Sequence, residues 1–367
     1  MARKKVLHIT YDMRIGGTEM VIKNIIEGSD AAKYEMSIFC IEQPIGPWGK
    51  ELEENGTEIF SKHRKDGFDL SLITEIRACI RNQNIDIIHC HQYTPWVYGV
   101  LAAIGLKTKV IFTEHGRFYP DSSSWKRKIV NPILSFFTDH ITAISKATKQ
   151  ALVDYEFLSA DKITVIYNGI KALPKVDEIE KYNLKQQLLI EDDDIVLGTV
   201  ARLDPIKNHE MMLNAFSDVV TKHPNTKLVI VGDGELLTTL KEQCQQLDIA
   251  DKVIFTGYIT KPGNYIEIFD VFLLSSLSEG ASMTLLEAMS LAKPCVVTDA
   301  GGNSEIIKNG CNGLVTENNN LNAFSHALLQ IINETDKTEA MGRAGQERFI
   351  TYFLETHMNQ QYTRFYR

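Results

Sequence analysis

The 367-residue chain lacks several features that mark special classes of protein. No stretch approaches the roughly 18 apolar residues of a membrane-spanning helix, and the apolar run after the basic start, residues 6–10, is too short for a signal-peptide core. The six cysteines are irregularly spaced and include no C-x-x-C pair, so the sequence offers neither a disulfide framework nor a cysteine metal site. Repeats and low-complexity tracts are also missing. We therefore expect a globular protein of a reducing cytoplasm.

Composition and charge further narrow the classes of protein to which the chain can belong. With 44% hydrophobic and 23% charged residues, the chain resembles ordinary soluble proteins, and its length suffices for two domains. Residues 1–175 carry 23 Lys and Arg against 20 Asp and Glu, whereas the remainder carries 16 against 27. The acidic second part argues against nucleic-acid binding. The basic first part is compatible with contact to the anionic inner face of a cell membrane.

Short apolar strands alternate with amphipathic helical segments through the first part of the chain. Residues 18–27 and 70–81, for example, have helical patterns. The expected strands are residues 6–10, 36–40, 85–90, 109–113, 140–144 and 163–167. Such alternation predicts an α/β domain whose parallel sheet is covered on both faces.

A polar segment interrupts this series, and the alternation then starts again. Residues 171–192 contain Pro174 and no strand pattern, so we predict a linker there. The second series of expected strands is 195–201, 227–232, 252–257, 271–276 and 294–299. We therefore predict two doubly wound Rossmann-like domains, residues 1–170 and 193–345, that face each other across a cleft at the carboxyl ends of their strands. Residues 346–367 are predicted to form a C-terminal helix.

The segment SEGASMTLLEAM carries two glutamates eight positions apart. Glu279 lies in a Glu-Gly turn, and Glu287 lies in the apolar-periodic helix that follows. The free amides and the dipole of a helix N-terminus attract a diphosphate, while the two carboxylates can accept hydrogen bonds from a transferred sugar and a ribose. This pattern suggests a nucleotide-sugar site. A solvated loop glutamate and a glutamate on a helix surface are the plainer alternative.

Arg202 and Lys207 lie in VARLDPIKNHEMML, directly after the first expected strand of the second series. A diphosphate leaving group gains negative charge as the sugar bond breaks, and fixed cations can stabilise it without a metal. From spacing alone, a surface pair of cations is an equally good description. Asp192, Asp193 and Asp194 precede a strand and are interpreted as a solvated loop. We therefore predict no catalytic metal.

The first part of the chain offers two glycines and a histidine as candidate site residues. Gly16 and Gly17 follow the first expected strand and open a helix, where backbone amides can approach a ligand closely, although such a pair is often only a turn. His115 follows another expected strand, where it can hydrogen-bond a sugar hydroxyl or serve the structure alone. His89 and His91 alternate on one strand with no third ligand in view. A metal site there is not predicted.

Several of these segments together resemble a known family. The E-x7-E pattern from Glu279 to Glu287, the IGGTE segment near the start and the aromatic C-terminal tail are similar to the retaining family-4 glycosyltransferases of bacterial polysaccharide type (glycosyl transferases group 1). The resemblance covers almost the whole chain. It implies the GT-B fold, two facing Rossmann-like domains with an interdomain cleft, and a C-terminal helix that crosses back to the N-terminal domain.

The resemblance also implies roles for the candidate residues. Glu279 positions the donor sugar, Glu287 binds the ribose, Arg202 and Lys207 clamp the diphosphate, and His115 contacts the sugar. The further substrate-binding residues that it implies are Gly16, Gly17, Ile259, Gly280, Ala281, Ser282, Met283 and Thr284. The sequence departs from the family at residues 281–283, where Phe-Pro or Phe-Gly often follows Glu-Gly, and this departure bears on sugar selection.

These observations lead to a functional expectation. We expect a metal-independent retaining enzyme that requires no cofactor and moves a hexose or N-acetylhexosamine from a nucleotide diphosphate sugar, UDP-linked rather than GDP-linked, to a glycan or lipid-linked acceptor in cell-surface polysaccharide synthesis. The alternatives are a sugar-nucleotide epimerase of similar fold and a non-catalytic sugar-nucleotide-binding component. In residues 122–137, Trp125 and three basic residues precede an apolar run, which indicates either a membrane-surface patch or an ordinary basic helix cap.

Overall fold

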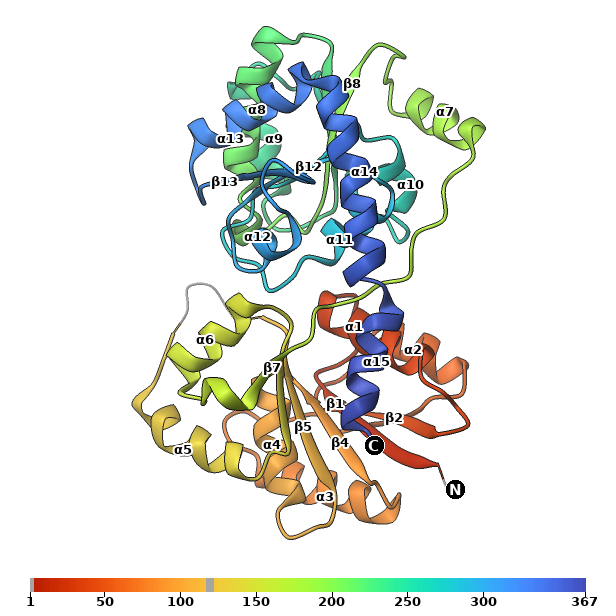
Figure 1. Ribbon diagram of the computed structural model, residues 1–367, viewed down its shortest axis with the longest axis vertical. Coiled ribbons are helices and arrows are strands. Elements are labelled where there is room, and N and C mark those ends of the chain that lie inside the picture. The colour runs from red at the N-terminus through yellow and green to blue at the C-terminus, as the bar shows by residue number, and fades with distance from the viewer. Residues whose placement is uncertain (1–2, 117–121) are drawn as a thin grey trace. The chain divides into compact units, whose positions relative to one another are not determined.

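The computed structural model describes residues 3–116 and 122–367, which form two compact units (Figure 1). Unit 1 contains the chain up to Gly169 together with Glu355–Arg367, and unit 2 contains Ile170–Leu354. Each unit has one parallel sheet flanked by helices. The chain therefore passes from unit 1 to unit 2 and returns at its end.

The sheet of unit 1 has seven parallel strands in the order β3-β2-β1-β4-β5-β6-β7. Their bounds are β1 Lys4–Thr10, β2 Tyr34–Cys40, β3 Glu58–Ser61, β4 Ile87–His91, β5 Lys109–Glu114, β6 His140–Ala143 and β7 Ile163–Val165. The helices of unit 1 are α1 Gly17–Glu27, α2 Pro47–Glu54, α3 Leu70–Asn82, α4 Tyr93–Ala103, α5 Trp125–Phe136, α6 Lys146–Glu156, the short η1 Ala160–Lys162 and the C-terminal α15 Glu355–Phe365.

The sheet of unit 2 has six parallel strands in the order β10-β9-β8-β11-β12-β13. Their bounds are β8 Ile195–Val200, β9 Thr226–Val231, β10 Val253–Gly257, β11 Val271–Leu274, β12 Cys295–Thr298 and β13 Gly313–Thr316. The helices of unit 2 are α7 Glu178–Gln187, η2 Pro205–Lys207, α8 His209–Lys222, α9 Leu237–Gln246, α10 Gly263–Glu267, α11 Met283–Ser290, α12 Asn303–Ile306, α13 Leu321–Asn333 and α14 Thr335–Tyr352.

The central strands are apolar because helices bury both of their faces. Every residue of β4 and β11 is buried, and β1 is buried from Val6 onward. In unit 1 the indole of Trp96 on α4 stacks on Phe112 of β5 with ring centroids 4.5 Å apart. Its Nε1 donates to the Thr138 hydroxyl at 2.9 Å, so the one polar atom of the ring is satisfied within the core.

Both sheets reverse their strand order at one point. In unit 1 the reversal lies between β1 and β4, and in unit 2 it lies between β8 and β11. Open α/β sheets bind ligands outside the carboxyl ends of the strands at such a reversal. The loops that follow these four strands are therefore the part of each unit in which a site is expected.

The α/β fold with two doubly wound sheets is confirmed, and the expected strands all form. Two strands were not predicted, β3 and β13. Each is only four residues long and lies at a sheet edge, and Glu58 at the start of β3 is exposed. Short edge strands carry little of the apolar signal from which strands are predicted.

Two segments differ from the predicted boundaries. The predicted linker, 171–192, belongs to unit 2 and contains α7, whose first turn is capped by the Asp177 carboxylate at 2.7 Å from the Ile179 amide. The C-terminal segment predicted as one helix from residue 346 is two helices, because α14 continues to Tyr352 in unit 2 and α15 begins at Glu355 in unit 1. Among the described residues, no helix is both long and apolar enough to cross a bilayer.

Candidate active site

In unit 2, a lysine and a glutamate meet where the strand order reverses. Lys207 ends η2 after β8, and Glu279 lies in the loop after β11. The Lys207 Nζ donates to Oε1 of Glu279 at 2.7 Å, and the Ser276 hydroxyl donates to the same oxygen at 2.7 Å. Within the described residues, the other carboxylate oxygen, Oε2, has no hydrogen-bond partner. The pair thus presents a positive charge and a free carboxylate oxygen side by side.

The loops that carry this pair are tied to each other through the backbone. The Leu277 amide donates to Ile206 O at 2.7 Å, and the Ser275 hydroxyl donates to Lys207 O at 2.8 Å. Asp204 caps η2 by accepting from the Ile206 and Lys207 amides at 3.0 and 3.2 Å. These bonds fix the position of Lys207 before any ligand binds.

Arg202 is bound to Asp204 rather than to this pair. Its guanidinium binds Asp204 Oδ2 through Nε and Nη2, each at 2.7 Å, and its side chain is 74% exposed. Asp204 therefore serves both as the cap of η2 and as the partner of Arg202. The structure brings Lys207 and Glu279 together and leaves Arg202 at the surface of the same loop.

Gly301 and Gly302 lie close against the backbone of Glu279 and fix its position. Gly301 has φ of +54°, and a Cβ atom there would lie 1.7 Å from the carbonyl oxygen of Glu279. The amide of Gly302 donates to that same oxygen at 3.3 Å. Only glycine fits at position 301, because a side chain would collide with backbone that cannot move aside.

The helix after the Glu-Gly turn starts as the sequence predicts. Ser282 is the N-cap of α11, and its hydroxyl accepts from the Leu285 amide at 3.3 Å. It also lies 3.1 Å from the hydroxyl of Thr284. Residues 280–284 thus form the turn and first residues of α11, with Ser282 and Met283 buried and Gly280, Ala281 and Thr284 half-buried.

Glu287 lies inside α11 and is 8% exposed. Its Oε2 is buried without a hydrogen-bond partner among the described residues. Burial disfavours the charged carboxylate and raises the pKa of Glu287 to about 7. A buried, unpartnered carboxylate is suited to a ligand that brings its own hydroxyl donors.

Replacement of Glu287 with glutamine is expected to change how stability depends on pH. Because the folded pKa of about 7 lies above the ordinary 4.5, the wild type loses stability as pH rises from 4.5 through 7. The neutral amide does not titrate, so the variant should gain about 3 kcal/mol at most relative to wild type over this window. Urea unfolding at several pH values measures this difference in the free energy of unfolding. The exposed Glu242→Gln is the control. A difference that is constant with pH would contradict the assignment.

Two further candidate segments of unit 2 follow β9 and β10. Gly234 packs on the loop after β8, since a Cβ there would be 2.4 Å from Leu203 O, and Leu203 N donates to Asp233 O at 3.0 Å. Ile259 follows β10 at the edge of the sheet and is half-buried, while its neighbour Tyr258 is 55% exposed. Among the described residues, Ile259 makes no hydrogen bond to Lys207 or Glu279.

In unit 1, Gly16 and Gly17 open α1 next to a glutamate that sequence reasoning missed. Gly16 is the N-cap of α1 and no side chain caps the helix. A Cβ at Gly16 would lie 2.5 Å from Oε2 of Glu19, so the carboxylate covers the start of the helix. Burial, followed by the charge of Asp12, raises the pKa of Glu19 to about 7. The first turn of α1 therefore carries an acid that is only partly ionised near neutral pH.

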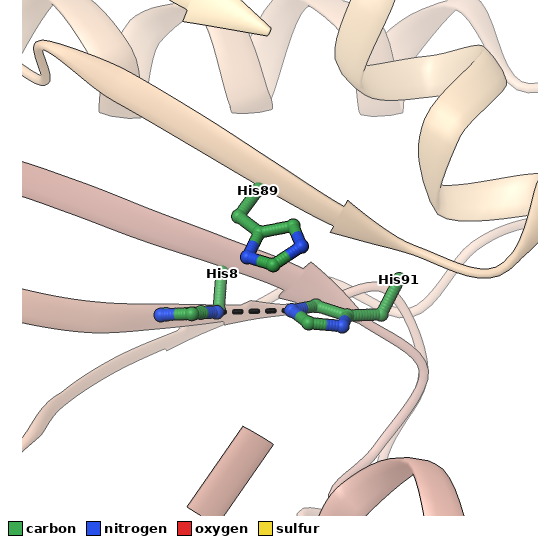
Figure 2. A group of neighbouring side chains, drawn as sticks. All are labelled: His8, His89 and His91. Atoms are coloured by element: carbon green, nitrogen blue, oxygen red, sulfur yellow. Dashed lines mark hydrogen bonds between the residues drawn. The ribbon is translucent and has the colours of Figure 1, made fainter. Parts of the chain in front are cut away.

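His115 is the end of a chain of imidazoles at the reversal of the unit 1 sheet. His8 Nδ1 lies 2.9 Å from His91 Nε2, and His91 Nδ1 lies 2.9 Å from His115 Nε2 (Figure 2 shows the first of these bonds). Burial lowers the pKa of His8 and His115 to about 3 and that of His91 well below its ordinary value. The three rings are therefore neutral near pH 7, and His91 donates a hydrogen bond through one ring nitrogen and accepts one through the other.

His89 belongs to a second set of hydrogen bonds. Its Nδ1 lies 2.7 Å from the Tyr366 hydroxyl and its Nε2 lies 2.7 Å from the Thr113 hydroxyl. His8, His89 and His91 each have a nitrogen within 4.8 Å of the others, close enough to surround a metal ion. A metal would have to replace several of these hydrogen bonds, so the geometry favours the hydrogen-bonded arrangement. Metal independence stays a prediction.

Sequence reasoning missed four residues that support the candidates. They are Ser276 and Asp204 in unit 2, and His8 and Glu19 in unit 1. Ser276 is three positions before Glu279 and Asp204 is two positions after Arg202, so spacing within one loop was the available signal. His8 had no such signal, because its partner His91 lies on a strand far along the sequence and is a neighbour only in the sheet.

Comparison with known proteins gives the family. Residues 15–172 match the model of Glycosyltransferase Family 4, and residues 180–348 match that of Glycosyl transferases group 1. The chain belongs to these glycosyltransferases, and the resemblance seen in its motifs is confirmed.

Relatives and solved structures agree with this family. An Escherichia coli protein named UDP-Gal:alpha-D-GlcNAc-diphosphoundecaprenol alpha-1,3-galactosyltransferase is 26% identical over 90% of this chain and 88% of its own. HepE of Anabaena, crystallised with UDP, is 22% identical with a TM-score of 0.87 over 98% and 99% of the two chains. A glycosyltransferase of Rickettsia africae is 20% identical with a TM-score of 0.88 over 100% and 98%. The two structures show that the chain has the GT-B fold.

Proposed function

We propose that this glycosyltransferase uses a UDP-sugar and transfers the sugar, with retention, to a glycan or lipid-linked acceptor in cell-surface polysaccharide synthesis. The observation that carries the proposal is the contact between Lys207 and Glu279 at the reversal of the unit 2 sheet. The name of the Escherichia coli relative gives a UDP-sugar donor and a diphosphoundecaprenol-linked acceptor. HepE was crystallised with UDP and with UDP-glucose. Both support UDP as the nucleotide of the donor.

The proposed donor site lies in the predicted domain 193–345. Lys207 neutralises charge that develops on the departing diphosphate, together with the amides at the start of α11. Arg202 turns from Asp204 toward the diphosphate when the donor binds, since a charge-assisted bond to phosphate can replace its exposed ion pair. Glu287 accepts hydrogen bonds from the hydroxyls of the ribose, and Ile259 lies against the base.

The proposed role of Glu279 is to hold the sugar. Lys207 and Ser276 both bind Oε1 and so fix the carboxylate, while Oε2 stays free to accept a sugar hydroxyl. The negative charge also stabilises positive charge on the sugar ring as the bond to the diphosphate breaks. Two carboxylates do not imply a double displacement here, because Glu287 is assigned to the ribose. In this proposal the acceptor proton passes to the departing phosphate oxygen.

The predicted domain 1–170 is the proposed acceptor side, completed by the segment predicted as 346–367. Gly16 and Gly17 offer backbone amides, and His115 presents Nδ1, which is buried and without a partner among the described residues. A neutral imidazole can donate to a sugar hydroxyl or accept from it, so His115 is assigned to the sugar. The acceptor's lipid would bring the enzyme to the inner face of the cell membrane.

A transfer assay tests the proposal. The enzyme is incubated with radiolabelled UDP-glucose, UDP-galactose or their N-acetylated forms, together with a polyprenyl-diphosphate-linked sugar, and the label in the lipid phase is counted. We expect one UDP-sugar to label the lipid only when enzyme and acceptor are both present. Conversion of the UDP-sugar into its epimer without acceptor would support the epimerase instead, and the proposed function would be wrong.

A further inference from the structure

An apolar stripe runs along the outer face of α5 in unit 1. Trp125, Ile129, Ile133 and Phe136 are 71%, 58%, 56% and 77% exposed, although they are large apolar side chains. Single exposed apolar residues are common, but four on one helix form a continuous surface that water solvates poorly. Such a surface needs an explanation.

Helix geometry places these four residues on one side. At about 100° per residue, positions 125, 129, 133 and 136 fall within an arc of about 80°. Asn131, Leu134 and Ser135, on the opposite side, are buried against the unit. The helix is therefore amphipathic, but its larger apolar side chains face outward and not toward the rest of the unit.

The opposite side of α5 is held in place by polar bonds. The Asn131 side-chain amide donates to the Glu156 carboxylate at 2.8 Å and to its backbone oxygen at 3.0 Å. Arg127 binds the same carboxylate at 2.9 Å, and its guanidinium lies over the ring of Tyr93 at 5.1 Å from the centroid. The outward direction of the stripe is thus set by the fold.

The flanks of the stripe are basic. Lys126 and Lys128 are exposed and fall on either side of it in the helical projection. Residues 122–137 contain three basic residues and no acidic residue. Large apolar side chains between lysines match an interface in which acyl chains lie beneath anionic headgroups.

We propose that α5 docks on an anionic lipid surface, with the stripe inserted at the level of the headgroups and Lys126 and Lys128 bound to the phosphates. This inference deepens the proposed function, because it names the surface that brings the enzyme to a lipid-linked acceptor. An anionic lipid surface offers an apolar layer for the stripe directly beneath phosphates for the lysines, and the helix has no acidic residue that such a surface would repel. The lipid surface is therefore the one occupant that matches both the stripe and its charge.

Vesicle sedimentation tests the inference with the full chain and without donor or acceptor. We expect the wild type to sediment with vesicles of phosphatidylglycerol and phosphatidylcholine and to stay in solution with phosphatidylcholine alone. The double variant Ile133→Ser with Phe136→Ser should bind about tenfold more weakly, and Lys126→Glu with Lys128→Glu should remove most of the salt-sensitive binding. Ile179→Ser with Leu189→Ser is the matched control, since these residues of unit 2 are 70% and 80% exposed.

Each outcome decides the inference. Wild type that stays in solution, or a serine variant that binds as well as the control, would overturn it. A change of sedimentation coefficient in the serine variant without lipid would show that the stripe joins two copies of the chain, which also overturns it. Because all six substituted positions are exposed, thermal unfolding should be unchanged in every variant. UDP binding by the same variants reports on the proposed function separately, so the two can fail independently.

Discussion

Glu279→Gln should lower the rate of sugar transfer by about 10²–10³-fold while the affinity for UDP stays nearly unchanged. The amide keeps the size of the side chain but removes the charge that is proposed to stabilise the transition state. UDP itself lacks the sugar that Glu279 is proposed to hold, so its binding loses little. Steady-state kinetics and calorimetric titration with UDP measure the two effects.

The geometry of the pair makes this variant informative. Glu279 has a side chain that is only 9% exposed and binds Lys207 and Ser276 through one oxygen, and a glutamine can still accept from both. Loss of turnover without loss of UDP affinity would therefore reflect the missing charge rather than a disrupted loop. Glu242→Gln on α9 is the control, because that side chain is exposed and far along the chain from these loops. Full activity of Glu279→Gln would show that the residue is misassigned.

Lys207→Ala should lower both turnover and the affinity for UDP. In the proposed site Lys207 faces the diphosphate before and during bond cleavage, so its loss should weaken ground-state and transition-state binding together. We expect turnover to fall by about 10²–10³-fold. Lys222→Ala, at the end of α8, is the control, since that lysine is exposed and outside the site.

The contrast between the two variants is the sharper result. Glu279→Gln separates turnover from UDP affinity, whereas Lys207→Ala reduces both. The same pattern from both variants would mean that either change merely disrupts the loops after β8 and β11. Unchanged UDP affinity in Lys207→Ala would contradict the assignment of this lysine to the diphosphate.

The sequence predicted the two sheets well because their strands are apolar and alternate with helices. The central strands, such as β4 and β11, are buried along their whole length. Buried strands are apolar, and this apolar pattern is what identifies them in the sequence. β3 and β13 were missed because they are short and lie at the edges. The division of the C-terminal segment into α14 and α15 was missed because apolar spacing continues across the break at residues 353 and 354.

The candidate site was predictable only where its parts are close in sequence. The Glu-Gly turn and the helix with Glu287 follow one another and could be read from spacing. The bond between Lys207 and Glu279 joins loops 72 positions apart, so only the parallel order of β8 and β11 brings them together. The link from His8 through His91 to His115 depends in the same way on sheet order. The orientation of Arg202 toward Asp204 could not be predicted from residue types.

The most direct test of the account is whether UDP binds and stabilises the protein. Thermal unfolding of the wild type is recorded with UDP, GDP or ADP, and the same series is recorded for Lys207→Ala. We predict that, of the three nucleotides, only UDP stabilises the wild type, by about 2.7 kcal/mol at about a hundred times its dissociation constant. The variant should require far more UDP for the same gain in stability. No stabilisation of the wild type by UDP, or equal stabilisation of the variant, would contradict the proposed donor site.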